Sequence, residues 1–158
     1  MSLKIFLHGL ESSNQGTKAV FFRERYPDML TPNFIGPLED RMTTLRQILS
    51  GRSGIRLVGS SFGGLMGAIF AMENEPLVER LILLAPAINL MDFPLCQERQ
   101  ISLPVWIYHG SADQVIPLGE VEPVARRIFR NLSFHVVDDD HFLHKTFKTI
   151  DWDFHLGE

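Results

Sequence analysis

Ser61 lies at the centre of a Gly-x-Ser-x-Gly pattern that runs from Gly59 to Gly63. The apolar run from Ile55 to Val58 precedes this pattern, and a small-residue segment with helical character follows it. Strand, sharp turn and helix in this order place a serine hydroxyl at the exposed point of the turn. The turn closes only where the residues two before and two after the serine are very small, and both are glycine here. The pattern therefore predicts that Ser61 is a nucleophile.

The neighbouring Ser60 fits the same turn poorly, because the branched side chain of Val58 lies two residues before it. Glycine and serine also occur in ordinary loops, so the pattern needs partners elsewhere in the chain. A serine hydroxyl is a weak nucleophile until a base takes its proton. We therefore expect a histidine within hydrogen-bond reach of Ser61, and an acid that orients this histidine.

Two residues that could be these partners each follow a predicted strand. Asp113 comes after the apolar run 105–108, and His141 comes after the run 134–137. The carboxyl ends of parallel strands meet at one edge of a sheet, where such sheets bind their ligands. Serine, aspartate and histidine in this chain order form one of the recurring arrangements for nucleophilic catalysis. We expect His141 to act as the base and Asp113 to orient it.

Acyl transfer also needs donors for the negative charge that develops on a carbonyl oxygen. Backbone N–H groups are the natural donors, and we expect them from Phe62, directly after the serine, and from Leu10, which follows His8 and Gly9. His8 is then expected to shape the loop that carries Leu10. His109 at the end of a strand and His135 within one are expected to be structural.

Two alternatives to this set remain open. His144 lies one helical turn beyond His141 and is the rival base, although His141 comes first after the strand. The run Asp138 to Asp140 contains carboxylates that could replace Asp113 as the acid, or bind a metal together with His141. Consecutive loop residues do not readily converge on one ion, so we expect a solvated acidic turn and no metal. Asp113 is preferred as the acid because it occupies its own strand end.

The elements that must position these residues alternate between strand and helix, with strands that are almost wholly apolar. This alternation indicates an α/β fold with a mostly parallel sheet of five or six strands and helices on both faces. Ser12, Ser13 or Asn14 is expected to cap the first helix. The strands are expected at residues 3–7, 55–58, 81–86, 105–108 and 134–137, with a weak edge strand at 29–33, and the helices near 16–26, 39–49, 62–73, 119–130 and 142–150.

Length and composition narrow the class of protein. The 158 residues, 45% of them hydrophobic, predict a single domain over residues 1–158. The net charge is −4 and the arginines are scattered, so the sequence has no basic patch that would indicate nucleic-acid binding. Cys96 is the only cysteine, which suits a reducing compartment. Because no run approaches a signal peptide or the roughly 20 apolar residues of a membrane span, we expect a cytoplasmic protein with no membrane partner.

Four segments of the chain resemble the α/β-hydrolase superfamily. They are residues 7–13, 58–64, 84–87 and 109–113, and together they look most like the small capless bacterial esterases of the YqiA-like kind. The resemblance covers essentially the whole chain. It implies the α/β-hydrolase fold without a cap domain and a Ser-His-Asp esterase, or a closely related acyl hydrolase, that uses no cofactor. It does not name the ester or an oligomeric state.

In place of a cap, the chain has only residues 87–103. Phe93 and Leu95 in this stretch could form an apolar wall that binds substrate beside Ser61, or belong to an ordinary connection. A missing cap leaves an open site, which favours short acyl groups or an exposed ester on a larger molecule. We therefore expect a small ester or thioester as substrate, cleaved through an acyl-enzyme. The alternatives are a peptidase or amidase with the same residues, or a non-catalytic binding protein.

Overall fold

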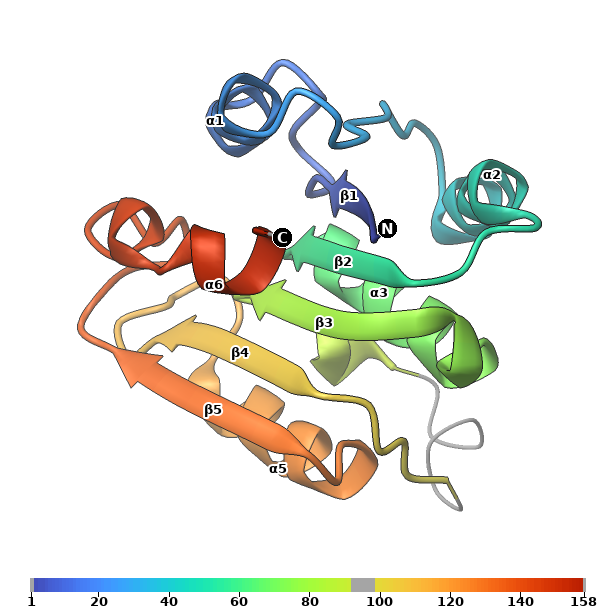
Figure 1. Cartoon of the computed structure of the whole chain (residues 1–158). Coiled ribbons are helices and arrows are strands. Elements are labelled where there is room, and N and C mark those ends of the chain that lie inside the picture. The colour runs from blue at the N-terminus through green and yellow to red at the C-terminus, as the bar shows by residue number, and fades with distance from the viewer. Residues whose placement is uncertain (1, 92–98, 158) are drawn as a thin grey trace.

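The computed structural model describes residues 2–91 and 99–157 of the chain. Its strands form one five-stranded sheet in the order β1-β2-β3-β4-β5, and each neighbouring pair is parallel, as the sequence predicted (Figure 1). The strands are β1 (Leu3–Leu7), β2 (Ile55–Ser60), β3 (Val78–Leu84), β4 (Val105–Gly110) and β5 (Leu132–Val137).

Helices cover both faces of this sheet (Figure 1). Buried side chains of α2, α3 and α5 form a core with one face, and those of α1 and α6 form a second core with the other. No helix in the described residues is long and apolar enough to cross a bilayer. The helices are α1 (Thr17–Arg25), α2 (Leu38–Leu49), α3 (Phe62–Glu73), α5 (Leu118–Ile128) and α6 (Trp152–Leu156), with short 3-10 turns η1 (Glu75–Leu77), η2 (Ile88–Leu90) and η3 (Phe147–Thr149).

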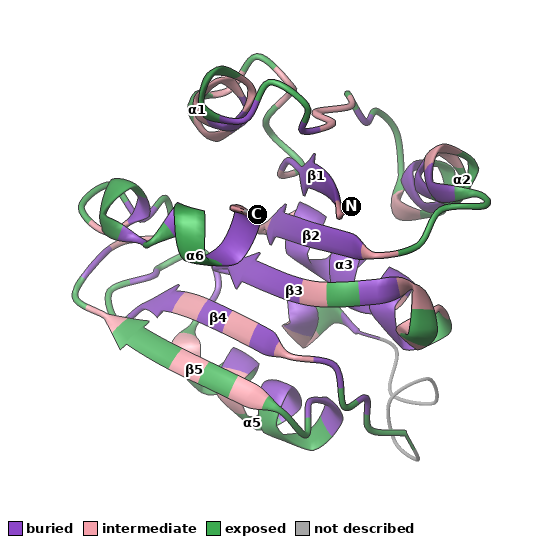
Figure 2. Ribbon diagram, viewed as in Figure 1, coloured by how far each residue is buried: buried purple, intermediate pink, exposed green. Residues whose placement is uncertain are grey.

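The central strands are apolar on both faces because each face packs against helices. In β2, Leu57 belongs to the core of α2, α3 and α5, whereas the next residue, Val58, belongs to the core of α1 and α6. The edge strand β5 differs, since its residues are half-buried or exposed (Figure 2). The expectation of a sheet covered on both faces is therefore right for β1 to β3 and wrong for β5.

The helix expected at residues 142–150 does not form. This stretch contains turns and the 3-10 turn η3, and Leu143 has a positive φ of 54°. The carboxylates of Asp139 and Asp140 accept hydrogen bonds from backbone N–H groups between Phe142 and Thr146. Such side-chain acceptors compete with helical hydrogen bonds, so the segment forms turns in place of the expected helix.

Two smaller expectations near the N-terminus were also wrong. The first helix, α1, begins after Gly16 without a side-chain cap, because Asn14 instead donates to the Thr31 carbonyl and Ser13 accepts from Gln15. The edge strand expected at 29–33 is reduced to a single bridge between Leu30 and Ile5.

Candidate active site

Ser61 occupies a strained turn between β2 and α3. Its φ of 55° and ψ of −116° are unfavourable for a residue with a side chain, so the surrounding structure must hold them. The Ser61 N–H donates to the carbonyl of Leu84 at 2.9 Å, and the Ser61 carbonyl accepts from Gly64 and Ala87, both at 2.9 Å. Strand β3 and its following loop therefore fix the backbone that presents the hydroxyl.

Close packing of the backbone requires glycine at both glycine positions of the pattern. A Cβ atom on Gly59 would overlap the carbonyl of Gly63, and a Cβ on Gly63 would overlap the carbonyl of Leu7 at the end of β1. Both obstacles are backbone atoms of packed elements and cannot move aside. The glycines thus let α3 begin directly against β1, which brings Ser61 close to the loop after β1.

Ser61, His141 and Asp113 form one hydrogen-bonded row. The Ser61 hydroxyl oxygen lies 3.0 Å from Nε2 of His141, and Nδ1 of His141 lies 2.8 Å from Oδ2 of Asp113. A carboxylate only accepts, so the imidazole proton belongs on Nδ1 and the bare Nε2 faces the serine hydroxyl. The other carboxylate oxygen accepts from the N–H groups of Val115 and Ile116 at 2.9 and 2.8 Å. This arrangement can remove the serine proton.

The loops that carry Asp113 and His141 are locked to each other. The N–H of Ser111, after β4, donates to the Val137 carbonyl at 2.8 Å, and that of Ala112 donates to the Asp139 carbonyl at 3.1 Å. Gly110 permits this approach, because a Cβ there would overlap the Asp139 carbonyl. The acid and the base are therefore held at a fixed separation.

Asp139 has a part in the site that the sequence did not reveal. Its side chain is buried and accepts from the N–H groups of Asp140, Lys145 and Thr146 at 2.8 to 3.0 Å. Burial acts to raise the pKa of this carboxyl, but these hydrogen bonds hold the pKa below its ordinary value. Asp139 thus shapes the loop around His141, so the solvated acidic turn was wrong for this residue. No cluster of metal-binding side chains occurs among the described residues.

His109 is the second group that the sequence undervalued. It is fully buried at the end of β4, with Nε2 2.8 Å from the Ile116 carbonyl and 3.3 Å from Oδ2 of Asp113. Burial lowers the pKa of His109, so the ring is neutral and carries its proton on Nε2, which faces these acceptors. It bonds backbone as expected, but it also contacts the acid.

The remaining histidines near the site have other partners. The His144 side chain is 71% exposed and pairs with Asp140 at 2.6 Å, so the structure places His141, not His144, at the serine. Both nitrogens of buried His8 are engaged, Nδ1 donating to the Gly9 carbonyl at 2.8 Å and Nε2 accepting from the Phe34 N–H at 2.9 Å. His135 stacks on Tyr108 in the sheet.

The loop after β1 and the start of α3 flank Ser61. A Cβ on Gly9 would lie 3.5 Å from the Ser61 Cβ, so this loop passes in contact with the serine. Leu10 follows on that loop, and Phe62 is the first residue of α3, where backbone N–H groups have no intrahelical acceptor. Neither the Leu10 nor the Phe62 N–H has an acceptor in the described part of the chain. The two groups are free to bind a ligand oxygen.

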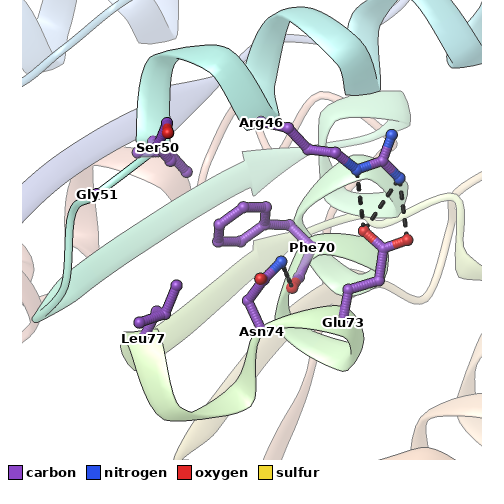
Figure 3. Close-up of a pocket in the computed structure, with 8 residues that line it drawn as sticks. Arg46, Ser50, Gly51, Phe70, Glu73, Asn74 and Leu77 are labelled. Carbon is purple, nitrogen blue, oxygen red and sulfur yellow. Dashed lines mark hydrogen bonds and ion pairs between the residues drawn. The ribbon is translucent and has the colours of Figure 1, made fainter.

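Phe93 and Leu95, the proposed substrate wall, lie outside the described residues. A surface cavity of about 490 Å³ lies elsewhere, between the C-terminal ends of α2 and α3 (Figure 3). Because α3 starts directly after Ser61 and ends at Glu73, this cavity is at the opposite end of that helix from the serine. Its charged groups, Arg46 and Glu73, pair with each other at 2.9 Å. The cavity is therefore separate from the candidate active site.

No protein-family model and no curated protein matches the chain, but many solved structures share its architecture. One described as a hydrolase of the α/β superfamily from Xanthomonas campestris is 23% identical, with a TM-score of 0.74, and the match covers 94% of this chain and 93% of that one. Est1E from Butyrivibrio proteoclasticus, with ferulic acid bound, is 15% identical, with a TM-score of 0.78 and coverage of 95% and 85%. Mouse α/β hydrolase domain-containing protein 10 is 19% identical, with a TM-score of 0.70 and coverage of 87% and 81%. The chain therefore has the α/β-hydrolase fold.

Proposed function

We propose that the protein is a serine hydrolase of the carboxylesterase type that cleaves a small ester or thioester through an acyl-enzyme on Ser61. The observation that carries this proposal is the row of hydrogen bonds from Ser61 through His141 to Asp113, at 3.0 and 2.8 Å. A serine in a strained turn, a histidine base and a buried acid, joined by hydrogen bonds, match the needs of nucleophilic catalysis.

In the first half of the reaction, the Ser61 oxygen attacks the ester carbonyl carbon while Nε2 of His141 takes its proton. Asp113 stabilises the imidazolium that forms. The N–H groups of Leu10 and Phe62 donate to the negatively charged oxygen of the tetrahedral intermediate. His141 then gives its proton to the departing alcohol or thiol, which leaves an acyl group on Ser61.

In the second half, a water molecule replaces the leaving group. His141 takes a proton from this water as it attacks the acyl carbon, and a second oxyanion forms at the same two N–H groups. When the intermediate collapses, the proton returns to the Ser61 oxygen and the carboxylic acid departs. An open site without a cap, as proposed here, would admit this water.

The similar structures support the reaction class through their names, two of which contain the word hydrolase. Est1E was solved with ferulic acid, a carboxylic acid, and a carboxylic acid is the kind of product that ester cleavage would release here. We extend the proposal to the small capless esterases of the YqiA-like kind, because the described residues form one domain around the sheet.

A fluorophosphonate probe, which phosphonylates activated serines, tests the proposal. It should label the native protein and the Ser60→Ala control but not Ser61→Ala, and only the first two should hydrolyse p-nitrophenyl acetate. Labelling that persists in Ser61→Ala would remove Ser61 from the mechanism. If the probe labels nothing and p-nitrophenyl esters, acyl-CoA thioesters and aminoacyl amides all resist cleavage, the protein is a binding domain and not an enzyme.

A further inference from the structure

Arg41 on α2 is a buried cation without a buried counter-ion. Its side chain is 4% exposed, and within the described ranges no carboxylate lies at ion-pair distance from its guanidinium. Nε donates to the Gly36 carbonyl at 2.8 Å and Nη2 to the Leu10 carbonyl at 3.5 Å, whereas Nη1 is buried with no partner. Because an unpaired buried charge is strongly unfavourable, this arrangement requires a physical reason.

The guanidinium lies beside both residues that would supply the oxyanion donors. It contacts the Leu10 carbonyl on one side, and its central carbon is 5.4 Å from the centre of the Phe62 ring on another. Burial lowers the pKa of Arg41, and the exposed carboxylate of Glu11 opposes this only from a distance. The charge of Arg41 also reaches His8, whose pKa is lowered first by burial and further by this arginine. The loop that carries Leu10 therefore lies in the field of a cation that forms no ion pair with the described residues.

We propose that Arg41 is a positioning residue of the oxyanion site, whose guanidinium has no ion-pair partner among the described residues until negative charge develops on the carbonyl oxygen bound by the Leu10 and Phe62 N–H groups. This inference rests on the proposed esterase function. The hydrogen bonds and the ring contact hold the two donor residues in place. The charge meanwhile favours the anionic intermediate over the neutral ester.

A cation of this kind raises turnover rather than substrate affinity. The ester in the ground state is neutral and gains little from the charge, whereas the tetrahedral intermediate is an anion. A carboxylate paired with Arg41 would cancel this difference in advance. The missing counter-ion is thus the feature that makes the arginine useful to catalysis.

The variants Arg41→Met and Arg41→Lys test the proposal, with Arg46→Met as a matched control. Arg46 lies on the same helix, is exposed and pairs with Glu73, so its loss should leave kcat for p-nitrophenyl acetate within about twofold. Arg41→Met should lower kcat by about tenfold or more with KM nearly unchanged, since it removes an interaction made only in the transition state. Arg41→Lys keeps the charge, and its kcat should lie between those of Arg41→Met and the Arg46→Met control.

Inhibition by phenylboronic acid gives a second measurement. Its adduct with a catalytic serine is a tetrahedral anion, so its inhibition constant should rise in Arg41→Met by the same factor as kcat/KM falls. A purely structural arginine would change the melting temperature without this parallel loss. Equal kcat in Arg41→Met and wild type, or an unchanged inhibition constant, would overturn the proposal.

If Arg41→Met does not fold, Arg41→Gln replaces it, because glutamine keeps a donor and loses the charge. We then expect Arg41→Gln to be slower than Arg41→Lys, and the reverse order would contradict the role of the charge. A wild-type protein with neither probe labelling nor turnover is a different result, since it would overturn the proposed function itself and this inference with it.

Discussion

The buried imidazole of His109 contacts the carboxylate of Asp113, with 3.3 Å between His109 Nε2 and Asp113 Oδ2. The same nitrogen donates to the Ile116 carbonyl at 2.8 Å, while the Ile116 N–H donates to the other oxygen of Asp113 at 2.8 Å. His109 thus contacts one carboxylate oxygen of the acid and bonds the carbonyl of Ile116, whose N–H bonds the other carboxylate oxygen. Together these contacts hold the carboxylate in the orientation that meets His141.

Replacing His109 should therefore slow the reaction through Asp113. His109→Phe keeps the ring volume but loses the donor, and we expect kcat about tenfold lower with KM unchanged. His109→Gln, which keeps a nitrogen donor near the same place, should recover most of this loss. In an Asp113→Asn background the His109→Phe change should have no further effect on kcat. Additive losses in that double variant would show that His109 acts on folding alone.

The choice of base is tested by His141→Ala and His144→Ala. Loss of His141 leaves the Ser61 hydroxyl without a proton acceptor, so kcat should fall by at least about a thousandfold. His144 is exposed and bonded to Asp140, so its loss should leave kcat within about twofold and lower stability only slightly. Steady-state hydrolysis of p-nitrophenyl butyrate measures both, and the opposite pattern would make His144 the base.

Gly63, one of the two glycines of the pattern around Ser61, can be tested against a second glycine that serves as a control. In Gly63→Ala the new Cβ would overlap the Leu7 carbonyl, so we expect a large loss of stability together with loss of probe labelling. Gly119, on the exposed surface of α5, has no heavy atom within 4 Å of a Cβ built there. Gly119→Ala should therefore stabilise the protein by about 0.4–1 kcal/mol. Thermal unfolding of both variants checks this contrast.

His155 should make stability depend on pH. Burial, and to a smaller extent the charge of Arg80, lower its pKa to about 4, while Asp151 opposes the shift. The unfolded state, with a pKa near 6.5, then binds the proton first, so stability is full above about pH 6.5 and falls as the pH drops toward 4. The loss from this residue is at most about 3 kcal/mol.

Urea unfolding from pH 7.5 to 4.5 measures this loss. His155→Gln, which has no titrating group, should flatten the fall in the free energy of unfolding. Part of the slope should remain, because the pKa values of His8 and His109 are also lowered by burial. A slope equal to that of the wild type would show that His155 does not take up a proton on unfolding.

The acyl-chain length that the enzyme prefers tests the proposal that its site is open. If the site has no cap, as we propose, long acyl chains gain little buried surface, so kcat/KM should not rise from p-nitrophenyl butyrate to the laurate or palmitate esters. A strong preference for the long chains would contradict the proposed open site. Monodisperse substrate below its micellar concentration is needed for a fair comparison.

Sequence alone predicted the five strands of the sheet and the helices α1, α2, α3 and α5, and it proposed the central residues, but it did not predict α6. The pattern around Ser61 is local, because the small neighbours and the strand before them are adjacent in the chain. The positions of Asp113 and His141 followed from a rule about strand ends, which needs no distances. The same local reasoning failed for residues 142–150, where the carboxylates of Asp139 and Asp140 compete with helix formation.

Only the tertiary structure decided which groups surround those residues. From the sequence, His109 was an ordinary strand-end histidine and Asp139 was one of three consecutive acids. In the structure both are buried, His109 contacts the acid Asp113, and Asp139 holds the loop that carries His141. Arg41 lies within the helix predicted at 39–49 and was not singled out, because its lack of an ion-pair partner among the described residues is visible only in the folded structure. The physical reason is the same in each case. The sequence gives the chemical nature of each side chain, whereas its burial and the partner of its charge depend on residues that are far away in the chain.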